Sequence, residues 1–379
     1  MSLWMLAATI AALLLLATIR VDGGRKNRWL VPGLLLGGLV AVVALGLGAS
    51  ATGYYPGSRA LRLAKQVSID LTDAARDPDV RRIILVEGSS YTARGLDGAM
   101  LGRLLTRGRG TKTAVVQMSL DGANHFERSG LLDIALDQLE PADRTALAGK
   151  DLTLLLEIQR GYDVAPLNGF VRKLRTWRTY AYMTPGNTWD GLRAVGSLGA
   201  TAPESMAALL PPAVEHAAVN AMGIGMARRG EQLASVKPAR GYQPLKASKR
   251  GYSHGRGMAD VLAAARAMAN APAAPVEAMP WIQDIRLPRY LAMLGDLVDS
   301  AAFFAVPSTE TADLQYVRQF CAQVDDLPCI EYRDPALLKR LQRKPDWNDA
   351  RHMRVSGAEK FTRWFARRYM RDVVAGTNG

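Results

Sequence analysis

At 379 residues the chain is long enough for one large domain or two of ordinary size, and its hydrophobic fraction of 49% is normal for a folded protein. The net charge of +13 favours an anionic partner. Four histidines and two cysteines, without the spacing that zinc ligands require, exclude a zinc site, and we expect no cofactor.

The N-terminus carries two uncharged apolar runs, residues 2–19 and 29–51. Each run is about long enough to cross a bilayer core of roughly 30 Å as a helix. The segment between them, residues 20–28, has four basic residues and one acid, so the positive-inside rule places it in the cytoplasm. We therefore predict two transmembrane helices, with residues 55–379 as a domain outside the cytoplasm.

The alternative for the first run is a cleaved signal peptide. Such a peptide carries basic residues before its apolar run, whereas here they follow it, which favours a retained helix. A domain outside the cytoplasm argues against nucleic acid as a partner and favours anionic lipid headgroups or an acidic polymer. An ordinary solvated surface is the simpler explanation for much of the positive charge.

Beyond residue 55, short apolar or β-rich runs alternate with helical patterns. Strands are predicted at residues 83–86, 113–118, 152–158, 301–306 and 329–332, and helices at 58–76, 96–106, 126–138, 286–299, 309–323, 335–342 and 356–373. This alternation predicts an α/β fold in three layers, a parallel sheet with helices on both faces. In such a sheet the site forms at the C-terminal ends of the strands.

Residues 165–285 interrupt the alternation and are predicted to be a largely helical insertion, in which the basic, Gly/Ser-rich stretch 236–258 is expected to be a loop. The absence of a Gly-x-Gly-x-x-Gly fingerprint and of a Walker-type loop argues against a nucleotide-binding protein. Cys321 falls on a predicted helix and Cys329 begins a predicted strand, so a disulfide between them stays open.

Two motifs at opposite ends of the predicted domain carry candidate chemistry. Gly88-Ser89-Ser90 ends the first predicted strand, and Asp349-x-x-His352 precedes the last predicted helix. An Asp three residues before a His can orient the imidazole and stabilise its protonated form, so that the His acts as a general base for a serine. Together the two motifs indicate a serine hydrolase.

Gly-Ser-Ser after a first strand, with Asp-x-x-His near the end, resembles the SGNH hydrolase superfamily, in which the first motif is usually Gly-Asp-Ser. Gly-Ser-Ser is similar to the variant in the membrane-anchored DltD-like members, which work on cell-surface polymers. The resemblance implies an SGNH-hydrolase-like domain with Ser90 as nucleophile, His352 as its base and Asp349 as the orienting acid. It also implies a two-pass protein of the bacterial cytoplasmic (inner) membrane whose catalytic domain is periplasmic.

The same resemblance implies an oxyanion hole built from the N–H groups of Ser90 and of a glycine after the second strand, a place that Gly122 takes here. The third motif of the superfamily is usually Gly-x-Asn-Asp. This chain has Gly-Tyr-Asp at 161–163 and departs from that pattern, which leaves either Tyr162 or Asn124 as the third donor.

Three further residues near these motifs are candidates for substrate binding, and each has an ordinary structural alternative. Arg94 follows the nucleophile by four residues and is suited to an anionic group or to an ion pair. His125 follows Gly122 and is suited to substrate or to a structural role. Trp347 precedes the Asp-x-x-His turn and is suited to stacking on a sugar or to packing.

The function that the resemblance implies is that of a membrane-anchored serine O-acyltransferase or esterase. An acyl group, most simply acetyl, would be carried on the serine to a hydroxyl of an exported polysaccharide or cell-envelope polymer, or to water. A membrane-bound O-acyltransferase is the implied partner. The alternative is a non-catalytic assembly factor of a polysaccharide modification or export complex, which the altered third motif favours and the complete Ser–His–Asp set disfavours.

Overall fold

The computed structural model describes residues 59–107, 111–163, 237–246, 255–268, 273–276, 279–324 and 326–375, together with the isolated positions 37, 189, 190 and 193. None of the helices in these ranges is long and apolar enough to cross a membrane. The predicted spans 2–19 and 29–51 lie, apart from position 37, outside the described residues, as do the loop 20–28 and much of the predicted insertion 165–285.

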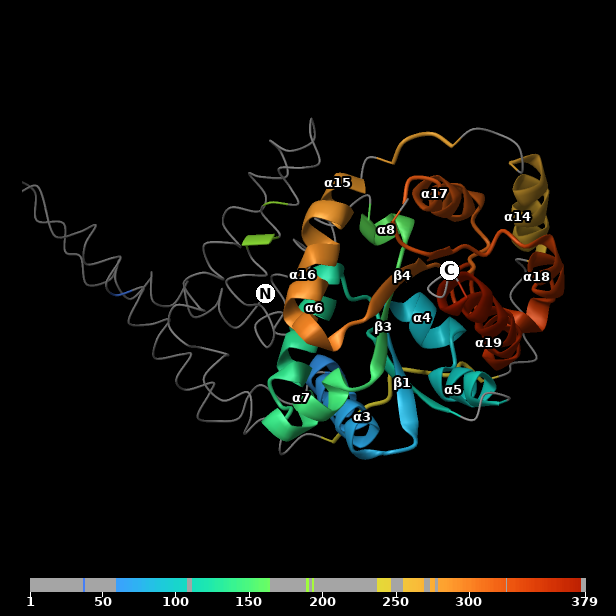
Figure 1. Cartoon of the computed structure of the whole chain (residues 1–379). Helices are drawn as coiled ribbons and strands as arrows, with labels where there is room; N and C mark the ends of the chain where they lie inside the picture. The colour runs from blue at the N-terminus through green and yellow to red at the C-terminus, as the bar shows by residue number, and fades with distance from the viewer. Residues whose placement is uncertain are drawn as a thin grey trace, which may run out of the picture.

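A five-stranded parallel sheet forms the centre of the described part of the chain (Figure 1). Its spatial order is β2 (Lys112–Ser119), β1 (Val80–Gly88), β3 (Asp151–Glu157), β4 (Ser300–Phe304) and β5 (Cys329–Ile330). Each strand overlaps a predicted one, so the prediction of a parallel α/β sheet is confirmed. The chain leaves β1 toward β2 and then crosses back to β3, and the C-terminal ends of strands at such a switch point are where ligand sites form.

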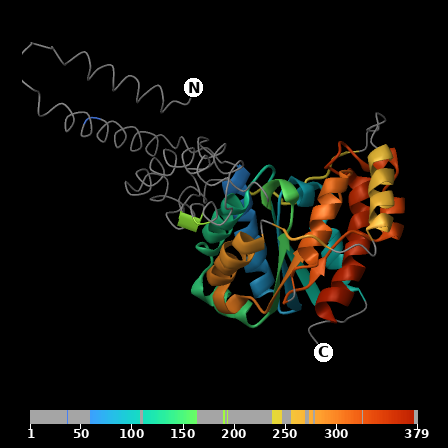
Figure 2. The same cartoon turned by 90° about the horizontal axis from the view of Figure 1, so that it is seen from above.

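Helices cover both faces of the sheet, which gives the predicted three layers (Figure 2). One face carries α3 (Arg59–Arg76), α6 (His125–Leu136), α7 (Pro141–Ala148) and α16 (Leu287–Leu294). The other face carries α4 (Ser90–Gly95), α5 (Gly98–Thr106) and α19 (Val355–Tyr369). A separate helix, α14 (Gly255–Ala267), packs against α17 (Thr311–Cys321) and α18 (Pro335–Arg340).

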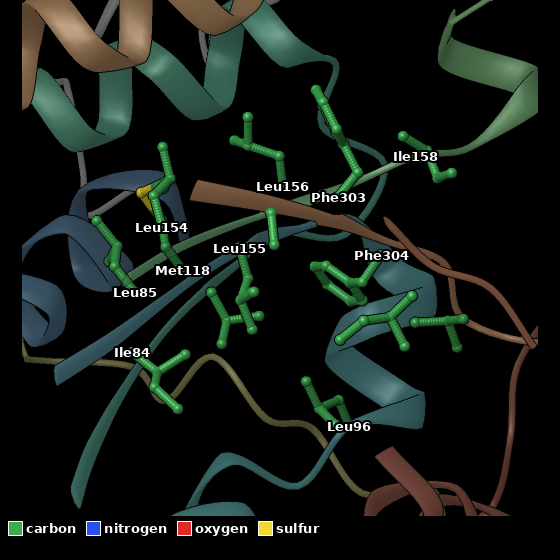
Figure 3. Packing of buried hydrophobic residues seen from close by; sticks show 14 of the residues in the cluster. Ile84, Leu85, Leu96, Met118, Leu154, Leu155, Leu156, Ile158, Phe303 and Phe304 are labelled. Atoms are coloured by element: carbon green, nitrogen blue, oxygen red, sulfur yellow. The ribbon is translucent and has the colours of Figure 1, made fainter. Parts of the chain in front are cut away.

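Alternate residues of the strands pack against opposite layers, as a sheet buried on both faces requires. On β4, Phe303 meets the ring of Phe320 on α17 at a centroid distance of 5.0 Å, whereas Phe304 meets Phe365 on α19 at 5.5 Å. Figure 3 shows Phe303 and Phe304 together with Ile84 and Leu85 of β1 and three leucines of β3, Leu154, Leu155 and Leu156. The apolar runs that predicted the strands therefore supply side chains to the hydrophobic core on both faces of the sheet.

Several elements differ from the predictions. The short helices α4 and α7 were not predicted, and the predicted helix 286–299 is a π-helical turn (Ile282–Arg286), α16 and a final 3-10 turn (Gly295–Leu297). The predicted loop 236–258 is confirmed for residues 237–246, which have no regular structure, but it is wrong from residue 255 onward, where α14 begins.

The two cysteines form a disulfide. Cys321 ends α17 and Cys329 begins β5, and their Cα atoms lie 5.5 Å apart, within the normal range for such a bridge. The short connection between α17 and β5 is therefore closed covalently, which answers the question that spacing alone left open.

Candidate active site

The strand β1 ends at Gly88, and α4 starts two residues later, so the Gly-Ser-Ser motif forms a tight strand-to-helix turn. A Cβ atom at position 88 would overlap the side chain of Thr92, one turn into α4. The first residue of the motif is therefore Gly because the helix packs directly on the end of the strand. The turn presents Ser90, partly exposed, at the C-terminal edge of the sheet.

The two serines of the motif have different environments. Ser89 is fully buried, and its Oγ caps α4 by accepting a hydrogen bond from the N–H of Tyr91 at 3.1 Å. Ser90 instead has its Oγ 2.9 Å from Nε2 of His352. Only the second serine is thus in contact with a base, as the predicted role of Ser90 requires.

His352 and Asp349 lie in the loop that precedes α19. Asp349 accepts the backbone N–H groups of Arg351 and His352, both at 2.9 Å, and its Oδ2 lies 2.8 Å from Nδ1 of His352. Partial burial opposes ionisation of Asp349, but the hydrogen bonds from Arg351 and His352 outweigh it and keep the pKa of this carboxyl below its ordinary value. Asp349 is therefore ionised at neutral pH.

This arrangement selects one tautomer of the imidazole. A carboxylate can only accept, so Nδ1 of His352 carries the proton and donates to Asp349. Nε2 then has a lone pair directed at the hydroxyl of Ser90, 2.9 Å away. Ser90, His352 and Asp349 are thus connected in the order that a nucleophile, a base and an orienting acid require, with each contact at hydrogen-bond distance.

The backbone N–H groups around the nucleophile are almost all engaged. Ser89 N–H and Thr92 N–H bind Glu157, and Tyr91 N–H binds Ser89 Oγ. Within the described residues the N–H of Ser90 has no protein acceptor, which leaves it available to a developing oxyanion.

The loop after β2 offers a second donor of the same kind. Gly122 has a φ of +62°, a conformation that favours glycine, in a turn closed by the N–H of Ala123 on the carbonyl of Leu120 at 3.1 Å. The N–H of Gly122 also finds no acceptor in the part of the chain that the structure covers. Both N–H groups are therefore available as donors, and their role in an oxyanion hole stays a prediction.

The third donor stays a prediction. Asn124 is buried and uses its Oδ1 to cap α6 through the N–H of Glu127 at 2.8 Å, so only its Nδ2 is left as a donor. Tyr162 lies on the short helix α8 (Arg160–Asp163), with the Arg128 guanidinium 5.4 Å from its ring centre. Gln159, two residues after β3, is also buried, but the side-chain atom of Gln159 without a hydrogen-bond partner is Oε1, which accepts and cannot donate to an oxyanion.

The three predicted substrate residues take their ordinary structural roles. Arg94 donates to Asp121 and to the carbonyl of Gln243, both at 2.9 Å. Trp347 is completely buried and donates its indole N–H to Leu341, and His125 is only 2% exposed. The burial of Trp347 and His125 favours the structural alternative for both, and their contact with substrate stays a prediction.

His125 belongs to a buried ionic cluster beneath the site, which the sequence analysis did not find. Its members are the acids Glu87, Glu157 and Asp163, the bases Arg128 and Arg286, and His125, all at most 3% exposed. Glu87 lies 3.0 Å from Arg128 and 2.9 Å from Arg286. Burial alone would raise the pKa of Glu87, but the two guanidinium groups lower it well below its ordinary value, so Glu87 is ionised.

The lowered pKa of Glu87 makes stability depend on pH. Its carboxyl has an ordinary value of 4.5 and a lower one in the folded state, so its contribution is complete above 4.5 and is lost as pH falls from there toward the folded value. We expect the free energy of unfolding to fall from pH 5 to pH 3 in urea titrations followed by tryptophan fluorescence. The decline should be smaller in Glu87→Gln, and an equal decline in both proteins would contradict this assignment.

The close contact between Gly88 and Thr92 predicts the effect of a single methyl group. Gly88→Ala is expected to cost about 1–3 kcal/mol of stability, because the turn must open to admit a Cβ. Gly161→Ala is the matched control, since a Cβ there meets nothing within 4 Å, and it should change stability by less than about 0.5 kcal/mol. Urea unfolding of both variants checks the difference, and equal stabilities would show that the turn is not tightly packed.

Comparison of the chain with protein-family models, with curated proteins and with solved structures gives no match.

Proposed function

We propose that the chain is a serine esterase or O-acyltransferase of the SGNH type, in which Ser90 carries an acyl group as an ester. The observation that supports this most directly is the contact of 2.9 Å between Ser90 Oγ and His352 Nε2, with Asp349 on the opposite nitrogen at 2.8 Å. A structural serine has no need of a base oriented in this way. Ser90 lies at the C-terminal end of β1, and the loop before α19 brings His352 and Asp349 to it, a place that suits a substrate arriving from outside the sheet.

The proposed reaction has two halves that use the same groups. Ser90 Oγ attacks the carbonyl carbon of an acyl donor while its proton passes to Nε2 of His352. The negative charge on the carbonyl oxygen is stabilised by the N–H groups of Ser90 and Gly122. Collapse expels the alcohol of the donor, which takes the proton from His352, and leaves acyl-Ser90. A second hydroxyl, from an acceptor or from water, then gives its proton to His352 and attacks the ester carbonyl. Collapse releases the acylated acceptor or the free acid, and the oxygen of Ser90 takes the proton back from His352.

We further propose that the acceptor is a hydroxyl of a polymer outside the cytoplasm. Three features support this proposal: the two apolar N-terminal runs, the net charge of +13, which suits an anionic surface, and the disulfide between Cys321 and Cys329, a bond typical of oxidising compartments. A membrane-bound O-acyltransferase that supplies the acyl group is the corresponding partner.

The experiment that tests the nucleophile is covalent labelling of the full chain in detergent. A fluorophosphonate is expected to modify Ser90, identified by mass spectrometry of the peptide, and p-nitrophenyl acetate is expected to give a burst of one nitrophenolate per active chain. Ser90→Ala should abolish both signals. Ser89→Ala should keep them, at a cost of about 1 kcal/mol in stability from the lost helix cap.

The possible results separate the alternatives. An adduct on Ser89 would mean that the motif is offset by one residue. No adduct in a chain that is folded by circular dichroism would favour the non-catalytic assembly factor. With an adduct on Ser90, addition of an oligosaccharide acceptor distinguishes the two activities, since a transferase yields an acylated acceptor and an esterase yields free acid.

A further inference from the structure

Glu157 is the last residue of β3 and lies beside β1, only 1% exposed. Its carboxylate accepts three hydrogen bonds from the nucleophile turn. The N–H of Ser89 donates to Oε2 at 2.5 Å, and the N–H and Oγ1–H of Thr92 donate to Oε1 at 3.2 and 2.8 Å. Among the described residues no other carboxylate accepts a hydrogen bond from this turn, so the two oxygen atoms of one side chain hold it.

The three hydrogen bonds bracket the nucleophile. Ser89 immediately precedes Ser90, and Thr92 follows it by two residues, so Glu157 holds the chain on either side of the reacting oxygen. The first N–H groups of a helix normally lack partners, and a carboxylate at this end is favoured by the helix dipole. Because Glu157 and the Ser89 side chain engage the neighbouring N–H groups, only that of Ser90 stays free for an oxyanion.

The division of contacts within the buried cluster separates Glu157 from its neighbour Glu87. Glu87 takes the closer contacts to the arginines, 3.0 Å to Arg128 and 2.9 Å to Arg286, whereas the Glu157 carboxylate lies 3.5 Å from Arg128. Glu87 makes no hydrogen bond to residues 88–92 in the described structure. The two acids thus lie in the same buried cluster, but Glu87 pairs with the arginines whereas Glu157 accepts hydrogen bonds from Ser89 and Thr92.

We propose that Glu157 is a positioning residue for the nucleophile. By anchoring Ser89 and Thr92 it fixes the hydroxyl of Ser90 at hydrogen-bond distance from His352 and directs the Ser90 N–H toward the oxyanion. Its effect is exerted through these two neighbours and not by contact with substrate. The proposal rests on the proposed function, since it assigns a role in the acylation of Ser90.

The test compares Glu157→Gln with Glu87→Gln in the full chain. Glutamine keeps the shape of the side chain, but its NH₂ group faces one of the donors from the turn and cannot accept. In Glu157→Gln the limiting rate of Ser90 acylation by p-nitrophenyl acetate is expected to fall about tenfold or more, with KM changed less than about twofold, because a misplaced nucleophile slows the chemical step. In Glu87→Gln the limiting rate of the folded protein should stay within about twofold of the wild type.

A second variant leaves the ionic cluster intact. Thr92→Val removes only the Oγ1 hydrogen bond to Glu157, and the limiting rate is expected to fall about three- to tenfold with the protein still folded. Thermal unfolding of each variant identifies a temperature at which all are native, so that the rates compare folded proteins. If Glu157→Gln does not fold, the rate of Thr92→Val decides the question.

The outcomes separate this proposal from the proposed function. If the wild-type chain is not labelled at Ser90, the function itself fails. If the wild type is labelled and both Glu157→Gln and Thr92→Val react at the wild-type limiting rate, the function stands and the positioning role is overturned. An equal loss of limiting rate in Glu87→Gln and Glu157→Gln also overturns it, because that result assigns the effect to the charge of the cluster and not to the anchored turn.

Discussion

Replacement of His352 by Gln is expected to slow acylation of Ser90 by about 10⁴-fold or more, with binding of the probe little changed. The hydroxyl of Ser90 is a weak nucleophile without a base, and within the described structure Nε2 of His352 is the base that it contacts, at 2.9 Å. The measurement is the rate constant for fluorophosphonate labelling of the full chain, with the adduct mapped to Ser90. A wild-type rate in this variant would rule out His352 as the base.

Asp349→Asn provides the second arm of the same prediction. Asparagine presents an NH₂ group to Nδ1 of His352 in some orientations, which favours the tautomer whose Nε2 carries the proton and cannot accept from Ser90. We expect a loss of about 10³-fold or more in the labelling rate. Glu310→Gln is the matched control, because Glu310 pairs with Arg351 at 2.8 Å beside the same loop without touching His352, and its rate should stay within about twofold.

The sheet was predictable because its strands are buried on both faces. Residues such as Leu154, Leu155 and Leu156 are all completely buried, so a continuous apolar run marks the strand without any need for alternation. The short helix α4 gave no such signal. It has six residues, and its place is determined by the close packing of Gly88 on Thr92, a contact that exists only once strand and helix are in position.

The proposed catalytic residues could be named from the sequence because each belongs to a local motif. Gly-Ser-Ser ends a strand and Asp-x-x-His precedes a helix, so each motif could be placed before the fold was known. The choice of Ser90 over Ser89 rested on the resemblance. In the structure the Oγ of Ser89 caps α4, whereas the Oγ of Ser90 contacts His352, which favours the same choice.

The supporting residues could not be predicted in the same way. Glu157 and Ser89 are 68 residues apart, and Arg286 lies 199 residues from Glu87. Nothing in a local pattern distinguishes a buried acid at the end of a strand from an exposed one. The burial of His125 and Trp347 could not be predicted for the same reason, because closeness to a motif in the sequence does not tell whether a side chain is exposed or covered.

Removal of Arg128 is expected to cause the largest loss of stability among single changes to the ionic cluster. Arg128 is fully buried, lies 3.0 Å from Glu87, and donates through Nε and one terminal nitrogen to the carbonyl of Ala123, each at 3.1 Å. In Arg128→Met these acceptors lose a partner that water cannot replace. We expect a loss of about 3–5 kcal/mol in urea unfolding, because a buried charge without its counterion is strongly destabilising.

The control is Arg82→Gln, which removes a partly exposed ion pair with Asp151 and should cost less than about 1 kcal/mol. Arg128→Lys is not expected to rescue stability, since an ammonium cannot reproduce the forked contacts to Glu87 and Ala123 at once. A stability of Arg128→Met equal to that of Arg82→Gln would show that the cluster is hydrated or replaceable.

The pH dependence of Arg128→Met supplies the decisive comparison. Arg128 is one of the two guanidinium groups that lower the pKa of Glu87, so its removal lets burial raise that pKa toward or above the ordinary value of 4.5. A carboxyl whose pKa in the folded protein is no longer below its value in the unfolded chain does not lower the free energy of unfolding when the pH falls. The variant should therefore be much less stable than the wild type at pH 7, and the gap should narrow as pH falls from 5 to 3. A gap that stays constant across this range would mean that Arg128 stabilises the fold by packing, with Glu87 held ionised by Arg286 alone.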